Sequence, residues 1–340
     1  MKITVLIATR DRSASLRSTL ESLFCDRNRT AGDWEAVVVD NGSSDDTPEV
    51  CASFRDRFPG QFRFYTENRQ GKSNALNLGI SIARGEVLAL TDDDVICAPD
   101  YIASIHTVFE RYAVDAAQGR VFADCTTGLP EWMSEELHSI MGISDCGDEV
   151  RIPFKRSLFG TNLAVFTETA RAIGGFAPEL GAGSTVGFSE DTEFSLRLRH
   201  AGYRIIYAPQ IVVHHHLSRH RLTRPCFYKR YFRDGRSRAY FAPYEAPLWR
   251  FGLYVVKNLI LSEPKAAWYR WKGHPAEAMD CQCDARRQAG FFWQHCLFYF
   301  GVPRRLTRIT SWPEQVSEAG LAMEQVPAVD HPGRAQTVRG

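Results

Sequence analysis

The first hundred residues alternate between short apolar runs and segments with helical apolar spacing, and this alternation limits the folds available to the chain. Strands are expected over 3–8, 35–39, 62–65 and 86–90, and helices over 13–24, 47–58 and 72–83. Strands that alternate with helices form βαβ units, which build a mostly parallel sheet with helices on both faces. The chain is therefore expected to be an α/β protein.

Polar side chains follow three of these strands, at the point where each strand ends. Thr9 follows the first strand, Asp40 the second and Asp92 the fourth. Ligands of such sheets bind outside the carboxyl ends of the strands. These groups are therefore expected to converge at one edge of the sheet.

The fourth strand runs into three consecutive carboxylates, Asp92, Asp93 and Asp94. Side chains two positions apart on a strand point to the same side, so Asp92 and Asp94 are placed to share one cation. Mg²⁺ and Mn²⁺ prefer oxygen ligands and leave positions open for phosphate. The alternative is a cluster that caps the helix after Pro99, but three acids exceed what capping needs.

A second acidic cluster, the sequence SEDTE at 189–193, opens an expected helix. One interpretation makes an acid of this cluster a general base that accepts a proton from an attacking hydroxyl. The other is an acidic first turn, which the helix dipole favours. The residues alone leave both interpretations open.

Three consecutive histidines, His214, His215 and His216, end the last expected strand. Strand alternation places His215 on one face and the other two on the opposite face. A histidine at a strand end is either a hydrogen-bonded core residue or, beside a metal site, a further ligand.

Phosphate-binding glycine motifs are absent from the sequence. No G-x-G-x-x-G follows the first strand and no G-x-x-x-x-G-K-[ST] occurs, which weakens dinucleotide oxidoreductase and P-loop ATPase interpretations. Lys72 either meets a diphosphate as a point charge or is a solvated lysine at a helix start. A receiver-type phosphotransfer pocket fits poorly, because it needs an acidic pair where the chain has Thr9-Arg10-Asp11.

Five motifs, in order within residues 1–240, make the chain similar to the inverting family 2 glycosyltransferases of the GT-A fold. They read VLIATRDR, VVVDNGSSDDT, GKSNALNLGISIARGEVLALTDDDV, GTNLAVFTETARAIGGF and GFSEDTEFSLRLRHAGYRIIYAPQIVVHH. The resemblance implies a Rossmann-like, mostly parallel sheet flanked by helices, here with a helical C-terminal extension. It also implies an enzyme of bacterial cell-surface polysaccharide or glycolipid assembly.

The resemblance further implies a nucleotide-diphospho-sugar donor, with UDP-sugars the first choice, and Mg²⁺ or Mn²⁺ as cofactor. It implies transfer of the sugar, with inversion, to a hydroxyl of a glycan or glycolipid acceptor. The competing hypothesis is a nucleotide-sugar-binding module without turnover.

Site roles follow from the same resemblance. The donor's base, ribose and diphosphate are assigned to Thr9, Arg10, Asp40, Lys72, Asp92 and Asp93. The metal is assigned to Asp94, Asp92 and His215, and the catalytic base to Asp191 beside Glu190. The acceptor side is assigned to Gly160, Thr161 and Asn162.

The expected organisation is a catalytic domain over 1–240, with a nucleotide-binding half (1–100) and an acceptor half (101–217). A helical extension over 241–303 and a loosely ordered tail over 304–340 follow. Segment 218–302 is rich in aromatic and basic residues, with eight Lys or Arg and one acid over 219–238. It is expected either to lie on an anionic membrane surface or to pack on the core or form a homodimer.

The overall charge is balanced, with 41 Lys and Arg against 40 Asp and Glu, which argues against nucleic acid as a partner. Nine cysteines without framework spacing and no secretory leader favour a reduced, cytoplasmic setting, with peripheral attachment to the inner face of the membrane as the further expectation.

Overall fold

The computed structural model describes residues 1–125, 128–151, 157–242 and 247–304. Within these residues eight strands form one sheet in the order β3-β2-β1-β4-β7-β6-β8-β5. The strands are β1 Ile3–Thr9, β2 Trp34–Asp40, β3 Phe62–Thr66, β4 Val87–Thr91, β5 Val95–Cys97, β6 Ala116–Asp124, β7 Asn162–Phe166 and β8 Ile205–His216. Strands β3, β2, β1 and β4 are parallel, whereas β7 and β5 run antiparallel to their neighbours. The expected α/β class and the four N-terminal strands are confirmed; the expected tail, beyond residue 304, lies outside the described residues.

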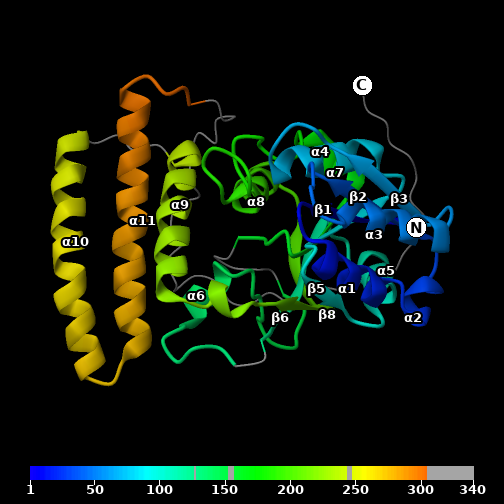
Figure 1. Ribbon diagram of the computed structural model, residues 1–340, viewed down its shortest axis with the longest axis horizontal. Coiled ribbons are helices and arrows are strands. Elements are labelled where there is room, and N and C mark those ends of the chain that lie inside the picture. The colour runs from blue at the N-terminus through cyan, green and yellow to red at the C-terminus, as the bar shows by residue number, and fades with distance from the viewer. Residues whose placement is uncertain (126–127, 152–156, 243–246, 305–340) are drawn as a thin grey trace.

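Helices cover both faces of the sheet (Figure 1). They are α1 Ser13–Leu23, α2 Asp26–Arg29, α3 Thr47–Arg57, α4 Lys72–Ile82, α5 Tyr101–Arg111, α6 Glu135–Ser139, α7 Thr167–Ala172, α8 Glu190–His200, the 3₁₀ turn η1 Arg219–Arg221, α9 Arg224–Phe241, α10 Leu248–Trp271 and α11 Pro275–Tyr299. The three helices expected between the first strands correspond to α1, α3 and α4.

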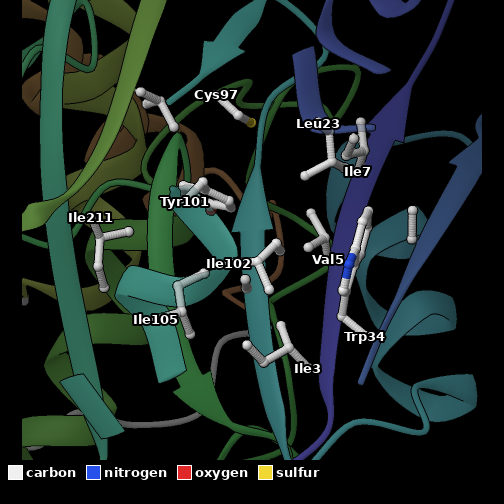
Figure 2. Close-up of a cluster of buried hydrophobic side chains, with 14 of the residues drawn as sticks. Ile3, Val5, Ile7, Leu23, Trp34, Cys97, Tyr101, Ile102, Ile105 and Ile211 are labelled. Carbon is white, nitrogen blue, oxygen red and sulfur yellow. The ribbon is translucent and has the colours of Figure 1, made fainter. Parts of the chain in front are cut away.

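Alternation along β1 explains how the sheet is buried on both sides. Ile3, Val5 and Ile7 belong to a core packed with α1, α3 and α5, whereas Leu6 belongs to the opposite core with α4, α7 and α8. Figure 2 shows the first core, where Trp34 lies beside β1 and Tyr101 comes from α5. Burial on both faces accounts for strands that are almost continuously apolar.

The last three helices pack side by side, with α11 between α9 and the outer helix α10 (Figure 1). Glycines permit the close approach of α9 and α11. A Cβ on Gly235 would lie 1.9 Å from the Arg287 carbonyl oxygen, and one on Gly290 would lie 1.9 Å from the Phe232 carbonyl oxygen. In the described residues, no helix has both the length and the apolarity needed to cross a membrane.

Candidate active site

The strand register brings the predicted polar residues to one edge of the sheet. Thr9 pairs with Asp40 at the ends of β1 and β2, and the acidic run follows β4, which is the other neighbour of β1. The Thr9 hydroxyl donates a hydrogen bond to Asp93 at 2.7 Å. Burial and the charge of Asp94 raise the pKa of Asp93 to about 6, although the Thr9 hydrogen bond opposes this.

A cleft of about 820 Å³ opens at this edge. Its walls come from the ends of β1 and β4, the start of α4, loop 182–189, the first turn of α8, and helices α6, α9 and α11. Of the predicted site residues it is lined by Thr9, Arg10, Lys72, Asp92, Asp93, Asp94, Thr161, Glu190, Asp191 and His215.

Lys72 joins the two acidic clusters across the cleft. Its Nζ lies 2.5 Å from Asp92 Oδ1 and 3.9 Å from Glu190 Oε1. Burial would lower the pKa of Lys72, but the charges of Asp92 and Glu190 raise it above its ordinary value. The other Asp92 oxygen accepts a hydrogen bond from the Thr161 hydroxyl at 2.8 Å. Lys72 is therefore a charged group fixed within the site rather than a solvated lysine.

Asp94 is surrounded by positively charged or hydrogen-bonding groups. His215 Nε2 lies 3.1 Å from its Oδ1, while Arg12 and Arg221 contact its Oδ2 at 3.2 and 2.8 Å. Burial would raise the pKa of Asp94, but the hydrogen bond and charge of His215 and the two arginines lower it below its ordinary value. This environment favours the ionised carboxylate.

Three side chains have the composition of a divalent-metal site. Asp92, Asp94 and His215 each offer a ligand atom, and these atoms lie within 4.8 Å of one another. The two carboxylates suit Mn²⁺ or Mg²⁺, and an imidazole is a common further metal ligand. The buried Nδ1 of His215 has no hydrogen-bond partner among the described residues, and its Nε2 lies 3.1 Å from Asp94. Asp92, Asp94 and His215 therefore fit a divalent metal ion.

Asp191 lies in the first turn of α8 and accepts backbone N–H bonds from Gly160 at 3.2 Å and Thr192 at 2.7 Å. Burial, followed by the charge of Glu190, raises the pKa of Asp191 from 3.8 to about 7. A carboxylate with a pKa near neutrality is suited to accept and release a proton.

Some predicted residues lie beside the cleft rather than in it. Asp40 accepts hydrogen bonds from the backbone and hydroxyl of Ser43 at 3.0 and 2.5 Å. Asn162 is buried, and its amide donates to the carbonyls of Arg120 and Ile211 at 2.9 Å each. Gly160 contacts the site through its backbone N–H, which donates to Asp191.

The three histidines divide as strand alternation predicts. His215 is buried, whereas His214 and His216 are exposed. The ring of His214 stacks on Phe122, and His216 pairs with Asp124 at 3.3 Å. Of the three, His215 is the one that faces the acidic run.

Sequence reasoning missed eight charged residues that line the cleft, namely Arg12, Glu135, Glu136, Arg221, Arg230, Asp234, Arg238 and Arg287. Arg12 stands in the TRDR motif, which gave a usable signal, whereas Arg221, Arg230 and Asp234 lie in a basic segment interpreted through its composition. Folding turns these three side chains toward the cleft. The expectation that segment 218–302 meets a membrane stays a prediction.

Comparison with known proteins identifies the family of the chain. Residues 4–177 match the family described as Glycosyl transferase family 2. The chain belongs to glycosyl transferase family 2. It is therefore a glycosyltransferase, and members of this family use nucleotide-sugar donors.

Among curated relatives, this family 2 glycosyltransferase is 26% identical to glucosyl-dolichyl phosphate glucuronosyltransferase of Haloferax volcanii over 243 residues, which cover 70% of the chain and 76% of that protein. It is 33% identical to validoxylamine A glucosyltransferase of Streptomyces hygroscopicus subsp. jinggangensis over 141 residues, but this match covers 41% of the chain and 32% of that protein.

Solved structures share the fold of this glycosyltransferase. Mannosyltransferase PcManGT from Pyrobaculum calidifontis, in complex with GDP-Man and Mn²⁺, superposes with a TM-score of 0.59 at 18% identity, covering 86% of the chain and 87% of PcManGT. S. aureus TarS 1–349 gives a TM-score of 0.50 at 14% identity, covering 97% and 99%. The GT-A fold expected from the sequence is confirmed.

Proposed function

We propose that this enzyme is a metal-dependent, inverting transferase that moves a sugar from a nucleotide diphosphate, with UDP the first choice, to an acceptor hydroxyl. The observation that carries the proposal is the contact of Lys72 with both acidic clusters. The contact supports the proposal because Glu190 is the neighbour of the candidate base Asp191, and both line the same cleft as the candidate metal ligands. We propose that one donor sugar spans the two clusters.

Asp92, Asp94 and His215 would hold the metal ion, which supplies charge neutralisation of the diphosphate when it is bound. Lys72, Arg12 and Arg221 add fixed positive charge beside it. These side chains exchange their present carboxylate contacts for phosphate oxygens and stabilise negative charge on the leaving nucleotide. The Nε of Arg221 is buried without a partner among the described residues, so it is a further donor for that purpose.

Asp191 acts as the general base. Its ionised carboxylate accepts the proton of the acceptor hydroxyl, and the oxygen attacks the anomeric carbon as the bond to the nucleotide diphosphate breaks. Attack from the face opposite the leaving group inverts the anomeric configuration. The Gly160 and Thr192 N–H bonds hold Asp191 in position during the transfer.

We also propose a role for loop 181–187 and a class of acceptor. Ala182 accepts a hydrogen bond from the Lys72 backbone at 2.8 Å, so the loop already lies against the start of α4. Closure of this loop over the donor would exclude water. We propose a lipid-linked or polysaccharide acceptor; among the relatives, the Haloferax protein is named for a dolichyl phosphate glycolipid.

The test is release of nucleotide from a panel of sugar nucleotides in the presence of Mn²⁺, with NMR of the product's anomeric carbon. Asp191→Asn is expected to retain donor binding and lose transfer, with Asp56→Asn as the matched surface control. Loss of donor binding in Asp191→Asn would show that its role is misassigned. Donor binding by the wild-type protein without any turnover would favour the binding-module alternative.

A further inference from the structure

Helix α10 carries a row of large apolar side chains that the described part of the chain leaves uncovered. Leu253, Ile260 and Trp271 are 64%, 66% and 78% exposed. The exposed members of the row are Trp249, Leu253, Tyr254, Val256, Ile260, Leu261, Trp268 and Trp271. Intervals of four, three and four residues between 249 and 260 place the row on one side of the helix. The opposite side packs on α11, and α10 is the outermost helix in Figure 1.

The charges that accompany this row are basic. Arg250, Lys257, Lys265 and Arg270 are exposed along α10. The single acid of this helix, Glu263, accepts hydrogen bonds from Gln282 and Arg286 of α11. Its charge is therefore matched within the protein, and the outer face presents apolar surface and cations.

Tryptophan–cation pairs mark both ends of the helix. Arg250 lies over the Trp249 ring at 5.3 Å, and Lys272 lies over the Trp271 ring at 5.0 Å. Tryptophan is favoured where an apolar phase meets water, because its ring is apolar and its N–H is polar. Aliphatic side chains occupy the middle of the row. This is the composition of a helix that lies in a membrane interface.

We propose that the outer face of α10 docks on the surface of a bilayer that contains anionic phospholipids, with the helix axis parallel to the membrane. A second copy of the chain suits the face less well, because two such faces would bring basic groups together without acids to pair them. Lipid phosphates supply the complementary charge. The proposal is independent of the proposed function, since no α10 residue lines the cleft.

Flotation of the full chain with vesicles tests this proposal. The protein should partition onto phosphatidylcholine vesicles that contain phosphatidylglycerol, and less onto phosphatidylcholine alone. Lys257→Gln with Lys265→Gln should lower the partition coefficient about 25-fold, since each basic residue contributes about fivefold. Leu253→Glu with Ile260→Glu should lower it by more than about a hundredfold.

The charge-matched control is Arg27→Gln with Arg55→Gln, two exposed residues of α2 and α3. It should bind vesicles like the wild-type protein, and all variants should transfer sugar equally well to a water-soluble acceptor. Vesicle binding that the α10 variants leave unchanged would overturn the proposal. So would a wild-type dimer that Leu253→Glu with Ile260→Glu separates in sedimentation while partitioning stays the same.

Discussion

Replacing Asp191 with asparagine should stabilise the folded protein at neutral pH while it removes transfer activity. Burial and the charge of Glu190 raise the pKa of Asp191 from 3.8 to about 7, so the folded state disfavours the ionised carboxylate. Each tenfold change in acidity corresponds to about 1.4 kcal/mol, so ionised Asp191 lowers the free energy of unfolding by about 4 kcal/mol above pH 7. Asparagine has one acceptor oxygen and loses one of two backbone N–H bonds, at about 1 kcal/mol. The net gain near pH 8 is about 3 kcal/mol.

The sign of this effect depends on pH. Below pH 3.8 the Asp191 carboxyl is protonated in both the folded and the unfolded chain, so its ionisation costs nothing. Between 3.8 and about 7 the unfolded chain ionises first, and the stability of the wild-type protein falls as the pH rises. The asparagine variant lacks this loss. The stability difference between the two proteins should therefore grow by roughly 2 to 3 kcal/mol from about pH 5 to about pH 8.

Urea unfolding at these two pH values, with chelator and without donor, measures the difference if both proteins unfold with the same dependence on urea. Asp56→Asn is the control, because that side chain is 73% exposed and its removal relieves no desolvation. Transfer by Asp191→Asn should fall by at least about a hundredfold. A stability difference that is equal at both pH values would refute the reasoning, whatever happens to the activity.

Three further outcomes are expected. The transfer rate of the wild-type enzyme should fall about tenfold for each pH unit below about 7, because Asp191 must be ionised to accept a proton. A flat pH–rate profile would contradict this. Chelation should abolish transfer and Mn²⁺ should restore it, whereas His215→Ala should raise the required Mn²⁺ concentration by more than about tenfold, measured by titration. Gly235→Ala should lower the free energy of unfolding by about 1 to 3 kcal/mol, because its Cβ would overlap the Arg287 carbonyl; an unchanged thermal midpoint would argue against the close packing of α9 and α11.

The N-terminal strands were predictable because their signals are local. Each is an apolar run bounded by a turn or a helix start, and the strand ends fall where Thr9, Asp40 and Asp92 stand. By contrast, β5 spans three residues and is defined by its antiparallel pairing with β8, which lies more than a hundred residues away. No local pattern marks such a strand, because the partner supplies the hydrogen bonds.

The residues of the candidate site also fall into two groups, those with a local sequence signal and those without one. Acids that follow strands, and a histidine whose face is set by alternation, could be placed from the sequence. Arg12 and Arg221 could not be assigned to Asp94, because that contact joins residues 82 and 127 positions apart. Composition left open whether segment 218–302 lies on a membrane, packs on the core or forms a homodimer. Packing of α9 beside the cleft turns part of its charge inward.

The inward charge connects the C-terminal helices to the proposed base. Ser189, immediately before α8, has a φ of 67°, a left-handed conformation that serine rarely adopts. Its hydroxyl donates to buried Asp234 of α9 at 2.9 Å, and Asp234 also pairs with Arg238 and with Arg287 of α11, each at 2.8 Å. This buried cluster fixes the backbone two residues before Asp191. Deleting α11 would leave Asp234 without one partner and free the turn that holds the base, so truncation would disturb transfer and any membrane contact together. Point changes on the outer face of α10 keep that cluster intact, and they separate the two properties.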